Sequence, residues 1–259
     1  MRQRGSRLRA SVAAVVLAAA LGGCSTASLT DVTGSIRNAN AAPAADTDPR
    51  RAVEMWGERY RANPRDAEAA LRYAQGLRAT GQRTQAVAVL EQATIVAPSD
   101  KALLGAFGRA LADVGNFQQA FEVLGRAHTP DNPDWRILSV QGAALDQLGR
   151  HDEARRYYAS ALKIVPDEPL VLSNLGLSYA LTRDLAKAEA TLRRAHRGGS
   201  ADPRVRQNLA LVVGLQGRFA EAEEIAKSDL PADEAAANVA YLRQMLSREG
   251  GDPRKPRAG

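Results

Sequence analysis

Two consecutive stretches decide the fold: residues 101–134, KALLGAFGRALADVGNFQQAFEVLGRAHTPDNPD, and residues 135–168, WRILSVQGAALDQLGRHDEARRYYASALKIVPDE. Laid one on the other without a gap, they carry small, large and turn-forming residues at the same positions, 34 residues apart. A fixed period between about 20 and 50 residues is typical of solenoids, in which each repeat is one supersecondary unit. The sequence therefore predicts a stack of similar two-helix units.

The spacing of 34 residues continues on both sides of these stretches. Small residues at regular positions let two helices approach each other closely, and large residues fill the layer between them. The recurring positions are an alanine at Ala86, Ala120, Ala154, Ala188 and Ala222, a small residue at Ala74, Gly108, Gly142, Gly176 and Ala210, and a large residue at Leu77, Leu111, Leu145, Tyr179 and Val213.

The predicted helix ends follow the same period. An aspartate precedes most first helices, where its carboxylate caps free backbone N–H groups, and a glycine closes most of them. The capping residues are Asp66, Asp100, Asp134 and Asp202, and the closing glycines are Gly81, Gly115, Gly149 and Gly217. The predicted units are 67–100, 101–134, 135–168, 169–202 and 203–230, with a single helix at 49–62 before them and another at 231–247 after them.

This pattern resembles the tetratricopeptide repeat family over roughly residues 50–247. The resemblance implies an all-α, right-handed solenoid of about five helix pairs, with an N-terminal half-repeat helix and a C-terminal capping helix. Three residues depart from the family pattern: Arg183 replaces a turn glycine, Gln141 replaces a large apolar residue, and Asp229 replaces an alanine. The last repeat is therefore predicted to be the most irregular.

The first residues predict export and lipid attachment. Four arginines precede an apolar run, Val12–Leu21, which is too short to span a bilayer and is typical of a signal peptide. The run ends in Leu21-Gly22-Gly23-Cys24, which resembles a bacterial lipobox, so we expect acyl chains such as palmitate on Cys24; an incidental cysteine is the alternative. Ser25 resembles the residue that sends Gram-negative lipoproteins to the periplasmic face of the outer membrane. The expected domains are a signal peptide (1–23), a lipid anchor and flexible tether (24–48), the repeat domain (49–247) and a disordered tail (248–259).

Composition argues against several classes of function. The chain has a formal charge of +6, but without residues 1–23 it keeps 31 basic and 29 acidic residues, a formal charge of +2. Basic residues are spread along the helices without interleaved aromatics, so we expect no nucleic-acid partner. The sequence has no phosphate loop, zinc-type cysteine spacing or nucleophile elbow, so we expect no metal, cofactor or small-molecule substrate, and no enzymatic activity.

A protein partner is expected to bind the first helices of the last two repeats. Asn174 and Asn208 occupy matched positions there, and an amide side chain can pair with the backbone of an extended peptide. The alternative is that some of the neighbouring leucines, Leu177 and Leu211 in particular, cover adjacent helices instead. The apolar residues of the predicted groove are Leu170, Leu177, Leu181, Leu211 and Leu215, and a more polar half contains Glu68, Arg72, Gln75, Arg78, Arg109, Asp113 and Arg136.

Two short segments, DVTGSI at 31–36 and WGERYRANP at 56–64, resemble the TadD lipoproteins of the tight-adherence (Flp) pilus assembly system. The resemblance implies a pilotin-like assembly factor whose partner is a secretin or another pilus-assembly component. A general outer-membrane scaffold, for protein insertion or for cell-wall enzymes, is the main alternative. An accessory subunit of an enzyme is a third.

Overall fold

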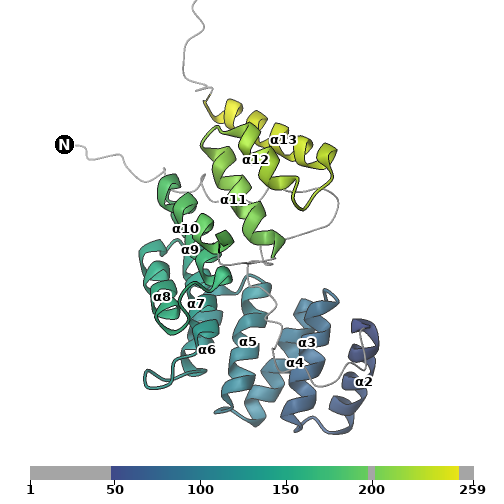
Figure 1. Ribbon diagram of the computed structural model, residues 1–259. Coiled ribbons are helices and arrows are strands. Elements are labelled where there is room, and N and C mark those ends of the chain that lie inside the picture. Colours follow the sequence, from purple (N-terminus) through teal and green to yellow (C-terminus); the bar gives the residue numbers. More distant parts are fainter. Residues whose placement is uncertain (1–47, 198–201, 251–259) are drawn as a thin grey trace, which may run out of the picture. The chain divides into compact units, whose positions relative to one another are not determined.

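The computed structural model describes residues 48–197 and 202–250, and the regular elements within them are all α-helices (Figure 1). The predicted fold class, an all-α solenoid of tetratricopeptide repeats, is confirmed. The chain divides into two compact units, called here the N-terminal unit, which ends at Pro166, and the C-terminal unit, which begins at Asp167. Each unit has a packed apolar interior of its own.

The N-terminal unit consists of one helix followed by three helix pairs. Every helix packs against the next along the chain, and the first helices of successive pairs, α3, α5 and α7, also contact one another. These three helices therefore form one face of the unit. The helices are α2 (Pro49–Ala62), α3 (Ala67–Ala79), α4 (Arg83–Val96), α5 (Lys101–Asp113), α6 (Phe117–Arg126), α7 (Trp135–Gln147) and α8 (His151–Ile164).

The C-terminal unit consists of two helix pairs and a long last helix. The first helices α9 and α11 contact each other, and α13 packs against both helices of the last pair. The last helix thus lies where a further repeat would otherwise stack. The helices are α9 (Pro169–Leu181), α10 (Leu185–Arg197), α11 (Pro203–Leu215), α12 (Phe219–Ala226) and α13 (Ala232–Gly250).

The predicted aspartate caps are confirmed. Asp66, Asp100, Asp134 and Asp202 each precede a first helix and accept a hydrogen bond from a backbone N–H of its first turn. At α9 the same place is taken by Glu168, followed by Pro169 at the first helical position, where a missing N–H costs nothing. Each carboxylate satisfies a donor that the helix itself leaves free.

The turns inside the repeats have one geometry, including the turn that lacks a glycine. Gly81, Gly115, Gly149 and Gly217 have φ between 75° and 84°, in the left-handed region that favours glycine. Arg183 occupies the equivalent place with φ 62°. A left-handed non-glycine residue costs about 1–2 kcal/mol, so this repeat keeps its turn at the expense of stability.

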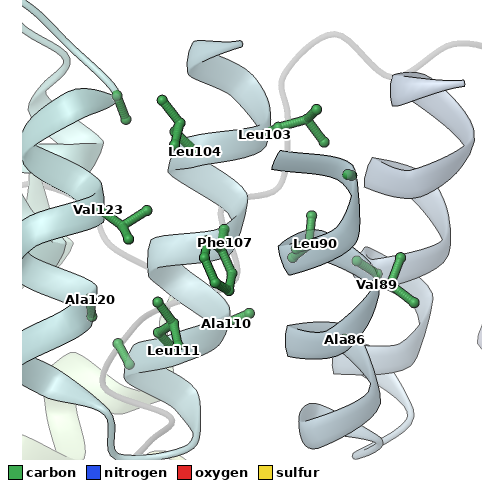
Figure 2. Packing of buried hydrophobic residues seen from close by; sticks show 14 of the residues in the cluster. Ala86, Val89, Leu90, Leu103, Leu104, Phe107, Ala110, Leu111, Ala120 and Val123 are labelled. Atoms are coloured by element: carbon green, nitrogen blue, oxygen red, sulfur yellow. The ribbon is translucent and has the colours of Figure 1, made fainter. Parts of the chain in front are cut away.

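The interior of the N-terminal unit lies in layers between successive helices. Figure 2 shows Leu90 of α4, Phe107 and Leu111 of α5, and Val123 of α6 within these layers, and all four side chains are buried. Some layers lie within a helix pair, and others join a second helix to the first helix of the following repeat, so neighbouring repeats stabilise one another.

The small residues sit where the two helices of a pair touch. A Cβ atom added to Gly142 would lie 2.6 Å from a ring carbon of Tyr158, and one added to Gly176 would lie 2.6 Å from Cγ of Leu192. Neither distance is compatible with an ordinary contact. Glycine at these positions therefore permits the close approach that the recurring small residues predict.

The two polar departures from the repeat pattern are buried and have partners. Gln141 is 2% exposed; its Oε1 lies 3.1 Å from Nε2 of His128, and its Nε2 donates to the carbonyl of Phe121 at 3.4 Å. Asp229, whose side chain is 7% exposed, accepts a two-point hydrogen bond from Arg206, with Nε at 2.7 Å. Both polar side chains are thus satisfied by partners that the period of the repeat does not reveal.

Candidate peptide-binding surface

Helix α9 places four of the predicted contact residues on one side. Leu170, Asn174, Leu177 and Leu181 follow one another at intervals of four, three and four residues, and all are half-buried. Residues at this spacing lie on one face of a helix. The structure therefore brings together an apolar stripe that is interrupted once by an amide.

Asn208 of α11 is half-buried and contributes to packing between helices. Its Nδ2 donates to Oγ of Ser173 on α9 at 2.9 Å, and Ser173 is 4% exposed. This hydrogen bond satisfies a buried hydroxyl and ties α11 to α9. Asn174 has an interaction of its own as well. At Asn208, the carbonyl oxygen and the second N–H of the amide are not used by the bond to Ser173.

Leu211 and Leu215 lie under the last helix. Leu211 is 7% exposed and packs with Leu242 of α13, and Leu215 and Leu246 join the same cluster. Between the two interpretations of Leu211, this packing favours coverage by a neighbouring helix. The sequence shows that α13 has apolar residues, but it does not show which leucines of α11 they cover.

An ionic network joins α10 to the turn between α11 and α12. Glu189 accepts hydrogen bonds from Gln216 at 2.8 Å, Arg218 at 2.7 Å and Arg193 at 2.8 Å. Burial by itself raises the pKa of Glu189, but these hydrogen bonds outweigh it and lower the pKa to about 2. Sequence reasoning missed this network because its members are up to 29 residues apart along the chain.

A small apolar pocket separates the last pair from α13. Its wall includes Ala210, Ala226 and Val239, with Gln207 and Asn238 as polar members. Ala226 stands where the other repeats have Leu90, Leu124, Tyr158 and Leu192. The pocket therefore lies where a large side chain is missing from the repeat pattern.

The predicted polar half of the surface lies in the N-terminal unit, on α3, α5 and α7. Arg78 donates from Nε to Asp113, and Arg72 lies 3.9 Å from Glu68 on the exposed side of α3. Gln75 is exposed, whereas Arg109 and Arg136 are half-buried. These side chains thus differ widely in their access to solvent and in their partners.

Other features of the described residues concern metals, membranes and the lipid anchor. Within 48–197 and 202–248, no group of three or more His, Cys, Asp or Glu side chains is placed to hold a metal ion. None of the helices in the same part of the chain combines the length and apolar character needed to cross a bilayer. Cys24 and the predicted signal peptide and tether lie outside the described residues.

Comparison with known proteins supports the repeat architecture. Residues 106–169 and 139–203 match the tetratricopeptide repeat family model. The curated protein BBS4 of the BBSome complex, from Bos taurus, is 25% identical over 142 residues, which are 55% of this chain and 27% of that protein. The chain thus spans about a quarter of the length of this relative.

Three solved structures share the fold. The Cut9–Hcn1 structure of the APC/C is 16% identical with a TM-score of 0.65, over 78% of this chain and 40% of that one. The pilF structure from Pseudomonas aeruginosa is 19% identical with a TM-score of 0.54, over 73% and 93% of the two chains. YrrB, described as a tetratricopeptide repeat protein with an unusual peptide-binding site, is 14% identical with a TM-score of 0.50, over 76% and 100%. The family model thus matches repeats within residues 106–203, and the solved structures share the helix-pair fold.

Proposed function

We propose that this protein is a non-enzymatic adaptor, anchored by lipid on Cys24 at the periplasmic face of the outer membrane, that binds a peptide segment of a pilus-assembly protein. The fold supports the role of a non-enzymatic adaptor, because tetratricopeptide repeats are typically scaffolds for protein–protein interaction. The apolar run and the Leu-Gly-Gly-Cys sequence before Ser25 support the anchor. In this proposal residues 24–48 link the lipid to the repeats, as the sequence predicts.

The observation that carries the binding proposal is the half-buried stripe of α9. Leu170, Leu177 and Leu181 can receive apolar side chains of an extended segment, and the amide of Asn174 lies among them. The remaining carbonyl and N–H of Asn208 can pair with the backbone of that segment. Leu211 and Leu215 pack with leucines of α13, so we assign them to packing of the last helix and not to direct contact with the peptide.

A secretin or another component of the tight-adherence pilus system is the partner we propose. The resemblance of residues 31–36 and 56–64 to TadD lipoproteins motivates this choice. Holding such a segment near the membrane raises its local concentration at the site of assembly, and no covalent step is required.

The proposal can be tested by photocrosslinking in living cells. A photoreactive amino acid at position 177 should capture a secretin or another pilus-assembly protein, identified by mass spectrometry. The control is position 190, because Ala190 is exposed on the second helix α10. Equal capture of the same protein from both positions would refute the stripe, and capture of cell-wall enzymes or insertion factors from position 177 would replace the pilus role with that of an envelope scaffold.

A pair of substitutions separates binding from folding. Leu177→Ala should weaken binding of the captured partner, whereas Leu177→Met, which keeps the apolar surface, should preserve it. Asn208→Ala is less informative, because it also removes the donor to the buried hydroxyl of Ser173. Unchanged affinity of the Leu177→Ala variant would contradict the proposed contact.

A further inference from the structure

The small pocket between the last helix pair and α13 is open to the surface. Ala226 of α12, which forms one wall, is 7% exposed, and Ala210 of α11, which forms another, is 8% exposed. The residues at the position of Ala226 in the four preceding repeats are 0–1% exposed: Leu90, Leu124, Leu192 and Tyr158. The space left by the missing large side chain is therefore not sealed inside the core, and a group from another molecule can reach it.

The walls and the volume of the pocket limit what it can hold. Leu211, Val239 and Leu242 line it together with the two alanines, so its walls are aliphatic. Its volume is about 30 Å³. A cavity holds one water molecule at about 10–15 Å³ and a benzene ring at about 150 Å³. The pocket therefore suits the branched methyl end of a valine or leucine side chain and not an aromatic ring.

Two amide side chains belong to the same pocket. Gln207 of α11 and Asn238 of α13 are half-buried, and among the described residues neither amide group has a hydrogen-bond partner. An amide side chain offers two donors and an acceptor, which match the carbonyl and N–H groups of a peptide backbone. A lipid chain has no such groups. The two amides therefore favour a peptide over a lipid as the occupant.

The residue at position 226 and the end of its helix both leave this pocket unfilled. Helix α12 ends at Ala226, whereas α8 continues beyond the equivalent Tyr158 as far as Ile164. A leucine at position 226, as in three other repeats, would fill the space, and filling a cavity commonly stabilises a protein. A position that breaks a local rule at a cost in stability is expected at a functional site.

We propose that this pocket binds an aliphatic side chain, of valine or leucine size, from the peptide segment of the protein partner. Gln207 and Asn238 pair with the backbone of that segment beside the inserted side chain. The inference rests on the proposed function, because it names the residue by which the same segment is recognised. Gln207 directly precedes Asn208, whose hydrogen bond to Ser173 ties α11 to α9, so the pocket and the α9 stripe lie in the same compact unit.

The test follows the methyl signals of the full chain by NMR spectroscopy while capped peptides are added at millimolar concentration. The probe is acetyl-Ser-Gly-Leu-Gly-Ser-amide, and the same peptide with alanine or phenylalanine in place of leucine tests the size of the side chain. Sodium hexanoate, an apolar chain without a peptide backbone, tests for a lipid ligand. Ala226→Leu fills the pocket, and Ala190→Leu, which adds the same side chain at an exposed position of α10, is the matched control.

We expect the leucine peptide to shift the methyl signals of Ala226 and Val239, and the alanine and phenylalanine peptides to leave them unchanged. Ala226→Leu should abolish the shift at Val239 while raising the melting temperature, so that loss of binding is separated from loss of folding. Ala190→Leu should keep the shift. Replacing Gln207 and Asn238 by alanine should weaken binding without lowering the melting temperature, because neither amide has a partner among the described residues.

Several outcomes would overturn the proposal: no shift in the wild-type chain, an equal shift from the alanine peptide, the phenylalanine peptide or hexanoate, or a shift that persists in the Ala226→Leu variant. Crosslinking from position 177 distinguishes this failure from failure of the proposed function. Capture of a pilus-assembly protein there, with no shift at Ala226, would refute the pocket alone. A shift at Ala226 without such capture would refute the α9 stripe and leave the pocket standing.

Discussion

Replacing Gly142 by alanine should destabilise the N-terminal unit, although alanine is the better helix former. The added Cβ would lie 2.6, 2.8 and 2.9 Å from three ring atoms of Tyr158. Carbon atoms in contact are normally about 3.5–4.0 Å apart, so the ring would have to move by about 1 Å. Tyr158 is 1% exposed, and its hydroxyl donates to Asp146 at 3.0 Å, so the ring has little freedom to move.

The expected magnitude follows from three opposing effects. Overpacking a close-packed core costs about 1–3 kcal/mol, and weakening of the hydrogen bond from Tyr158 adds about 1 kcal/mol. Replacing glycine by alanine in a helix stabilises the folded state by about 1 kcal/mol. The free energy of unfolding should therefore fall by about 1–3 kcal/mol, as measured by urea denaturation followed by circular dichroism.

Two further variants make this prediction specific. Gly105→Ala is the matched control: the nearest atoms to its Cβ lie at 3.4 Å or more, so it should stabilise α5 by up to about 1 kcal/mol. The first repeat pairs Ala74 with Leu90 at the positions of Gly142 and Tyr158, so adding Tyr158→Leu to Gly142→Ala should recover part of the loss. Stabilisation by Gly142→Ala alone would refute the close-approach reasoning.

Three other predictions concern packing and charge. Ala226→Leu should fill the pocket beside α13 and stabilise the protein by about 0.5–2 kcal/mol. The same change at the fully buried Ala154 should destabilise the protein by about 1–3 kcal/mol. A thermal melt that ranks the two variants the other way would contradict the assigned packing. Asp229→Ala should destabilise the C-terminal unit by about 1–3 kcal/mol in urea denaturation, because it removes the two-point hydrogen bond with Arg206. No change in the free energy of unfolding would mean that the pair is dispensable. The folded pKa of Glu189 is about 2, below its unfolded value, so its stabilising effect is present above about pH 4.5 and is lost as the pH falls toward 2. Glu189→Gln should therefore reduce the loss of stability in acid. An unchanged pH dependence of the free energy of unfolding would exclude the effect.

The period, the helix ends and the positions of close approach can all be predicted from the amino-acid sequence. Asp100 and Gly115 are sufficient to place a helix between them, because capping and the left-handed turn are local requirements met within a few residues. The turn at Arg183 is also predictable, although it lacks the usual glycine, because the 34-residue spacing marks its position. Local chemistry repeated at a fixed interval is information that a sequence contains directly.

Which partner each of these side chains meets depends on the tertiary structure. Asn208 donates to a serine 35 residues away, and Leu211 is covered by α13. Helical periodicity shows which face of a helix a residue occupies, but not which neighbour reaches that face or whether its donors are already used. The candidate surface of α9 was therefore predictable as a stripe, while the division of its residues between packing and binding depends on contacts between distant parts of the chain.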